Sequence, residues 1–319
     1  MNEQIYQALI TEIQKKFSKN SVMVDALADI LRIEKGAVYR RLRQEVPFTF
    51  DEIVNIAKNL NISLDNLAGV KNNKNALFQL QLQNFISPQE SDYYAFDSYI
   101  NFLRSLNKSD DSETASISNV LPHDLLYGFD YLLRFYLFGW NYHRSADKAK
   151  QFHQISITPE LSKFFNEYTL EMKNFKKTCY VFDNRVFRFF VDRINYFFSI
   201  RLIEKEDVLK IKEDLNSMLD YLEKMALTGQ FKETGNAVNI YISDIDINAC
   251  YTYFESKDIH LSMIRAFILS YVTTFDEETF ERTKGAINAL IKFSTLITLT
   301  NEKQRVLFFE KQRKIINEL

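Results

Sequence analysis

Residues 27–45 read LADILRIEKGAVYRRLRQE, and this stretch contains two short apolar periods with an interruption between them. The first period ends at Leu31, and Arg32-Ile33-Glu34 breaks it. Val38 and Leu42, which are spaced i and i+4, begin the second period. Two short helices joined by a turn of about three or four residues form a helix-turn-helix. The stretch therefore predicts this motif near the N-terminus.

The second helix, expected over Lys35–Arg43, presents a basic face. With Val38 and Leu42 inward on the helical wheel, the opposite face carries Gly36, Arg40 and Arg43, with Tyr39 beside them. Residues 32–43 carry five basic side chains and one acidic one, a local balance of 5 − 1 = +4. Glycine allows close approach to the backbone, and arginine can donate to guanine or to phosphate. This pattern favours a DNA-binding face over a merely solvated charged face.

Other candidate DNA contacts flank this helix. Ser21 and Thr49 open neighbouring helices, whose N-terminal amides can donate to phosphates. Arg41 lies nearer the inward face, where it is either a phosphate contact or one half of an internal ion pair. The complete candidate set is Ser21, Lys35, Gly36, Tyr39, Arg40, Arg41, Arg43 and Thr49.

The rest of the N-terminal region predicts three further helices, making five in about 70 residues. The first has an apolar spacing of four from Ile5 to Phe17, with Asn2 as a candidate cap. Thr49-Phe50-Asp51-Glu52 reads as a capping box for another helix. Ser63 is expected to cap the last short helix, and Gly69 to end it.

Residues 1–69 resemble the Cro/cI-type helix-turn-helix family of DNA-binding regulators. The segment FTFDEIVNIAKNLNISLDNLAG, residues 48–69, is similar to the one that follows the recognition helix in that family. Arg32 stands where the family usually has a glycine, so we expect a left-handed residue there at a cost of roughly 1 kcal/mol. Glu34 replaces the usual Ser or Thr, so we expect the recognition helix to lack a strong cap.

The polar segment 71–77 is expected to be a linker between a domain at 1–70 and a larger domain at 78–319. The larger domain is expected to be mainly helical, with a small β element; no fixed repeat is present. Short strands are indicated around 116–121 and 238–253. Helices are predicted over 76–86, 94–106, 124–142, 159–177, 184–203, 205–227, 262–274, 277–299 and 301–319.

Composition excludes several classes of function. The 319 residues have a net charge of −2, and the two cysteines, Cys179 and Cys250, are isolated. Asp244 and Asp246 are explained most simply by an exposed strand face, and His143 and Asp147 lack a third ligand. The 28 Phe and 17 Tyr indicate a bulky core, while a small-molecule pocket among them stays open. We therefore expect no catalytic residue, metal or cofactor.

These observations predict a cytoplasmic, sequence-specific DNA-binding transcriptional regulator that is not an enzyme. The Lys35–Arg43 helix would read the major groove of double-stranded DNA, with two copies in a homodimer reading two half-sites. The larger domain would supply dimerisation and a site for an unknown small-molecule or peptide effector. Two alternatives stay open: a ligand- or peptide-sensing regulator whose larger domain is the main functional site, and a protein–protein assembly module that does not bind DNA. No membrane span is expected.

Overall fold

The computed structural model describes residues 3–17, 20–60, 62–64, 76–80, 83–144, 151–257, 259–266 and 270–319. The chain divides into two compact units, Met1–Leu77 and Phe78–Leu319. Each unit has its own hydrophobic core.

Four helices of the first unit lie within the described residues: α1 (Glu3–Lys15), α2 (Asn20–Leu31), α3 (Lys35–Leu42) and α4 (Phe50–Leu60). Their apolar faces meet in a core that includes Leu9, Ile13, Leu27, Val38 and Ile56. The helix-turn-helix predicted from residues 27–45 is thus present as α2, a turn and α3. The fifth helix expected over 63–69 lies largely outside the described residues, as do Asn2 and most of the linker.

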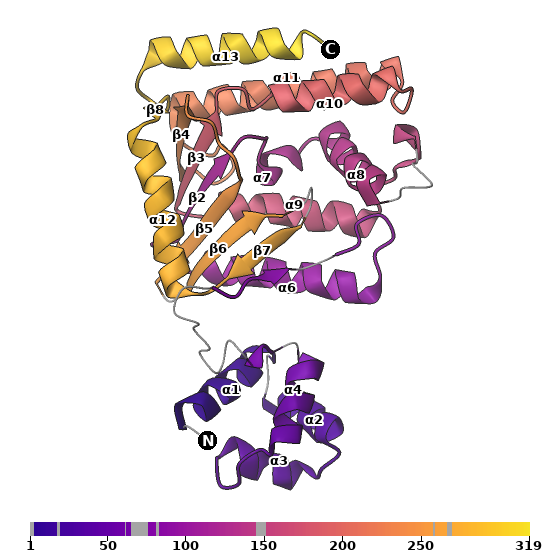
Figure 1. Cartoon of the computed structure of the whole chain (residues 1–319), viewed down its shortest axis with the longest axis vertical. Coiled ribbons are helices and arrows are strands. Elements are labelled where there is room, and N and C mark those ends of the chain that lie inside the picture. Colours follow the sequence, from indigo (N-terminus) through magenta and orange to yellow (C-terminus); the bar gives the residue numbers. More distant parts are fainter. Residues whose placement is uncertain are drawn as a thin grey trace. The chain divides into compact units, whose positions relative to one another are not determined.

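An eight-stranded mixed sheet is the centre of the second unit (Figure 1). Its strands are β1 (Gln79–Leu80), β2 (Glu113–Ser118), β3 (Lys177–Asp183), β4 (Ala237–Ser243), β5 (Tyr251–Ser256), β6 (Ile259–Arg265), β7 (Tyr271–Thr274) and β8 (Thr295–Leu296). They are ordered β1-β7-β6-β5-β2-β3-β4-β8. The pairs β2–β3 and β3–β4 are parallel, and the remaining pairs are antiparallel.

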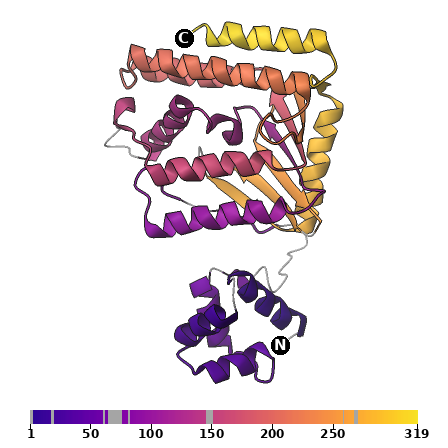
Figure 2. The same ribbon diagram turned by 180° about the vertical axis from the view of Figure 1, so that it is seen from behind.

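Most of the helices cover one face of this sheet. They are α6 (Glu90–Leu106), α7 (His123–Leu126), α8 (Asp130–Arg144), α9 (Pro159–Lys173), α10 (Arg188–Ser199), α11 (Lys205–Thr228) and α13 (Glu302–Ile316), with the 3₁₀ turn η1 (Phe152–Gln154). The crossovers between the parallel strands run through α7–α9 and α10–α11, and their apolar side chains form the large core with Tyr180 and Phe182 of β3. Figure 2 shows this helical layer from behind, with α6 and α9 side by side.

Of the described helices, α12 (Glu277–Lys292) alone packs on the opposite face. It connects β7 to β8, which lie near opposite edges of the sheet, so it must cross the strands between them. Phe280 and Ile287 of α12 are fully buried against Ala115, Ile117 and Val181. Alternate residues of β3 therefore contribute to two different cores, as the twofold period of a strand requires.

The expected fold class, mainly helical with only a small β element, is wrong for the second unit. The described residues of the two units form twelve α-helices, and those of the second unit include the eight-stranded sheet. The helix predicted over 262–274 is replaced by parts of β6 and β7, and the one predicted over 76–86 by β1 and irregular backbone. Strand β3 was not predicted at all. The strands expected around 116–121 and 238–253 are confirmed as the regions of β2, β4 and β5.

The aromatic residues of 187–198, which illustrate the bulky core expected from the many Phe and Tyr residues, divide between core and surface. Phe187, Phe190 and Phe197 are buried, whereas Phe189 and Tyr196 are exposed. None of the helices in the described part of the chain is long and apolar enough to cross a membrane.

Candidate nucleic-acid interface

The turn between α2 and α3 depends on a left-handed residue. Arg32 has a φ of 54°, and the Ile33 N–H donates to the Ala28 carbonyl over 3.2 Å. This bond spans the helix end in the manner of a Schellman motif, in which the left-handed position is usually glycine. The expectation of a left-handed residue at Arg32 is confirmed. Because Arg32 is exposed, its side chain extends from the turn toward solvent.

Helix α3 begins without a side-chain cap and ends in a second Schellman motif. Glu34 occupies the N-cap position, and its side chain makes no capping hydrogen bond, as expected from the missing Ser or Thr. At the other end Gln44 has a φ of 63°, and the Glu45 N–H donates to the Arg40 carbonyl over 2.9 Å. Two tight turns thus fix both ends of this helix.

The two faces of α3 differ sharply in exposure. Val38 is 0% exposed in the core, while Lys35, Gly36, Tyr39, Arg40 and Arg43 are exposed. A Cβ atom at Gly36 would meet nothing within 4 Å apart from its chain neighbours and the backbone of its own helix. Internal packing therefore does not require a glycine at this position, although glycine in a helix costs about 1 kcal/mol relative to alanine.

Of the two roles expected for Arg41, a phosphate contact or an internal ion pair, the structure has the ion pair. Arg41 Nη2 lies 2.7 Å from Glu52 Oε1, and its Nε donates to Glu52 Oε2 over 2.9 Å. The two side chains are only 16% and 15% exposed. Arg41 thereby fixes α3 to the start of α4.

Glu52 also closes the predicted capping box of α4, which is confirmed. The Thr49 N–H donates to Glu52 Oε2 over 2.8 Å, and the Glu52 N–H donates to Thr49 Oγ1 over 3.3 Å. Burial raises the pKa of Glu52, but the hydrogen bonds from Arg41 and Thr49 outweigh burial and leave it below its ordinary value. Because the Thr49 amide is already bonded, a phosphate at this helix end would have to contact the next amides instead.

Tyr6 joins α1 to the end of α3. Its hydroxyl donates to the Arg41 carbonyl over 3.1 Å and accepts from the Phe48 N–H over 3.0 Å. The Tyr6 and Phe48 rings stack with centroids 5.9 Å apart. Helix α3 is consequently held by α1, α2 and α4, which makes it a rigid element.

Two of the exposed cations have carboxylate neighbours at the surface. Lys35 Nζ lies 2.7 Å from Asp25 Oδ1, and Arg43 Nη1 lies 3.9 Å from Glu45 Oε1. Exposed pairs of this kind contribute about 0–1 kcal/mol, so both cations can exchange a carboxylate for a phosphate at little cost. The Arg43 guanidinium also lies 6.0 Å from the centre of the Tyr39 ring. Ser21 is exposed in the first turn of α2.

Asp244 and Asp246, two acidic residues considered in the sequence, each have a partner within the second unit. Asp246 pairs with Arg185 over 2.6 Å, and Asp244 accepts a hydrogen bond from Asn184. Asp147 lies outside the described residues, so its spacing from His143 is not addressed by the structure. Within the described ranges, no three His, Cys, Asp or Glu side chains gather as metal ligands.

Comparison with known proteins gives no assignment. No family model, no curated protein and no solved structure matches this chain.

Proposed function

We propose that this protein is a cytoplasmic, sequence-specific DNA-binding transcriptional regulator that acts through α3. The observation that carries the proposal is the contrast between the two sides of this short helix. Val38 anchors one side in the core, while Gly36, Tyr39, Arg40 and Arg43 share the exposed side. A helix presented in this way can enter the major groove of B-DNA.

The expected mechanism assigns different contacts to different residues. Arg40 and Arg43 read base edges from the exposed side of α3, and Gly36 lets the DNA approach the helix backbone. Lys35 and Arg32 contact phosphates, which set the position of the helix on the duplex. The ion pair between Arg41 and Glu52 keeps α3 rigid rather than touching DNA.

Dimerisation follows from the size of the unit. One small helix-turn-helix buries too little surface to discriminate among the many competing sites in a genome. Two copies held about one helical turn of DNA apart would read two half-sites. The second unit would supply the dimer contact in this proposal.

The test is a selection of bound fragments from genomic DNA with the purified full chain, followed by affinity measurements on the preferred site. Arg40→Ala and Arg43→Ala should each lose about 1–3 kcal/mol of specific binding and relax the choice of base. The matched control is Arg282→Ala, because Arg282 is 79% exposed on α12 of the second unit and pairs with Glu278. It should bind as the parent does.

Arg41→Ala supplies a second comparison, since it removes the brace of α3. It should weaken binding to all sequences nearly alike. If Arg40→Ala and Arg43→Ala both bind the selected site with parental affinity, α3 does not read DNA. A DNA affinity that does not change with salt concentration would instead favour the protein–protein assembly alternative. Contacts to phosphates make the affinity for DNA fall steeply as the salt concentration rises.

A further inference from the structure

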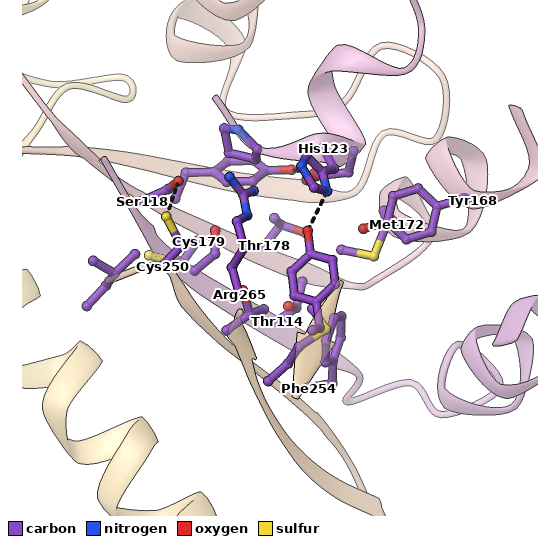
Figure 3. A pocket seen from close by; sticks show the side chains of 18 residues that line it. Thr114, Ser118, His123, Tyr168, Met172, Thr178, Cys179, Cys250, Phe254 and Arg265 are labelled. Atoms are coloured by element: carbon purple, nitrogen blue, oxygen red, sulfur yellow. Dashed lines mark hydrogen bonds between the residues drawn. The ribbon is translucent and has the colours of Figure 1, made fainter. Parts of the chain in front are cut away.

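A small cavity lined by both apolar and polar side chains lies inside the second unit, between the sheet and two helices of the many-helix face. Strands β2, β3, β5 and β6 form its floor, and residues of α7 and α9 cover it. Its free volume is about 30 Å³, which is room for about one or two waters or a single carboxylate group. Figure 3 shows Arg265 extending from the sheet into the space between Ser118 and His123.

Several hydrogen-bond donors around this cavity have no acceptor within the described ranges of the chain. Arg265 Nε is shielded from solvent and makes no hydrogen bond there. The same is true of Thr178 Oγ1, in a residue that is only 3% exposed, and of Ser116 Oγ. Buried donors without an acceptor are unfavourable unless a ligand or water satisfies them.

Among the described residues, no carboxylate lies within 4.0 Å of the nitrogens of the Arg265 guanidinium, so it has no direct counter-ion there. The Tyr271 and Tyr136 hydroxyls are among its polar neighbours. Arg265 is half-buried, and a charged group that is partly withdrawn from water is stabilised by an anionic partner. The arrangement therefore leaves room for an anion.

Asp124 and His123, which line the cavity, already have hydrogen-bond partners. Asp124 accepts a hydrogen bond from the Tyr180 hydroxyl, and the Tyr271 hydroxyl is bonded to His123 Nδ1 over 2.5 Å. Burial raises the pKa of Asp124, although the Tyr180 hydrogen bond and Arg265 oppose the shift. Because burial disfavours the ionised form of Asp124, the fixed charge of the cavity is dominated by Arg265.

We propose that this cavity binds the carboxylate group of a small organic acid, with Arg265 as the ionic anchor and the Thr178 and Ser116 hydroxyls as further donors. A planar carboxylate matches the fork of a guanidinium, which can donate two parallel hydrogen bonds to it. The small volume admits the carboxylate and little else, so the rest of the acid must be short or lie outside the cavity. This proposal does not depend on whether the protein binds DNA.

The experiment titrates the full chain, without DNA, with sodium acetate in an isothermal calorimeter. Sodium chloride at the same ionic strength and acetamide are the controls for charge screening and for shape. Acetate should bind with a dissociation constant on the order of 1 mM, as expected for so few heavy atoms. Equal effects of acetamide or chloride, or no binding of acetate up to about 100 mM, a hundredfold above that constant, would overturn the proposal.

Substitutions locate the binding site. Arg265→Gln should reduce acetate affinity by at least about 30-fold, since a charge-assisted pair is lost. Thr178→Val keeps the shape of the side chain and should reduce affinity by about 5- to 20-fold. Thr169→Val is its matched control, because Thr169 is 8% exposed, also has an unpartnered hydroxyl among the described residues, and does not line the cavity.

The outcomes separate clearly even if one variant does not fold. Reduced affinity of Thr178→Val with parental affinity of Thr169→Val supports the site on its own, should Arg265→Gln fail to fold. Parental affinity of Thr178→Val overturns the assignment of that hydroxyl as a donor to the carboxylate. A folded Arg265→Gln variant that binds acetate as well as the parent overturns the proposal as a whole.

Discussion

The two units of this chain place their charged groups in opposite ways. In the described part of the first unit, every buried residue of the core is apolar or is Tyr6. All the buried polar side chains of the described residues belong to the second unit, among them His123, Asp124 and Arg305. The polar and charged side chains of the first unit thus lie nearer its surface, including those of α3, whereas the second unit also has polar side chains in its interior.

The substitution with the largest expected effect on stability tests whether the two units unfold independently. Phe280→Ala should destabilise the second unit by about 3–5 kcal/mol, because Phe280 is fully buried. Its ring also stacks on His260 with centroids 4.4 Å apart. Trp140 is the single tryptophan and lies in α8, so its fluorescence during urea unfolding reports the second unit.

Leu27→Ala is the reciprocal change, in a residue that is 0% exposed in the core of the first unit. It should cost about 2–5 kcal/mol there and leave the Trp140 transition where it is. A shift of the Trp140 transition by Leu27→Ala of the same size as that caused by Phe280→Ala would show that the units unfold as one.

The same contrast explains what the sequence could predict. The helices of the first unit carry local signals, such as the Thr49–Glu52 capping box and the spacing of Val38 and Leu42, and these signals lie within a few residues of each other. Strand β3 reads KTCYVFD and is covered on both faces, so it lacks the alternation that identifies a half-buried strand. Periodicity alone cannot distinguish such a run from part of a helix.

The cavity could not be predicted from the sequence, because its polar side chains come from separate strands. Thr178 and Arg265 are far apart in the chain, and only the order of the strands brings β3 and β6 to the same surface of the sheet. No motif marks these residues, because the ligand-facing groups come one at a time from different strands. The proposed DNA-reading face, by contrast, comes from one continuous helix.

A smaller effect concerns the ion pair that braces α3. Glu52→Gln keeps a side-chain acceptor for the cap but removes the charge that Arg41 needs, which should cost about 1–3 kcal/mol. Because the folded pKa of Glu52 is lowered, its contribution is present above the ordinary glutamate value of 4.5 and is lost as pH falls through the lower folded value.

Hydrogen exchange measured by mass spectrometry on peptides from α3 and α4 checks this prediction in the full chain. The parent should lose protection in these peptides on acidification below the ordinary glutamate pKa, and Glu52→Gln should start lower and change less. Comparable acid-induced losses in the two proteins would mean that another group is responsible. Peptides from α11 in the second unit provide the internal reference.

The turn before α3 gives the next smaller effect. Arg32→Gly should stabilise the first unit by about 1 kcal/mol, since glycine adopts the positive φ of this position without strain. The change should also slow hydrogen exchange in α2 and α3. Lys58→Gly is the matched control at an exposed site inside α4, where glycine should instead cost about 1 kcal/mol. Destabilisation by Arg32→Gly would mean that the arginine side chain holds the turn.

The substitution with the smallest expected effect, Gly36→Ala, tests the stability of the first unit and its affinity for DNA separately. Gly36→Ala adds one methyl group to the exposed side of α3, where nothing lies within 4 Å of it apart from the chain neighbours and the backbone of α3 itself. Alanine is the better helix former, so the first unit should gain about 0.5–1 kcal/mol in stability. If DNA approaches the backbone of α3 at this point, the same methyl group must lie in its path, and affinity for the selected site should fall. Exchange protection of α3 and DNA affinity are then expected to move in opposite directions. The control is Ala37→Gly, a neighbouring position that is partly buried and should lose stability through the same backbone effect. If Gly36→Ala gains stability and keeps full affinity, DNA does not approach this face closely, and the glycine has no role in binding.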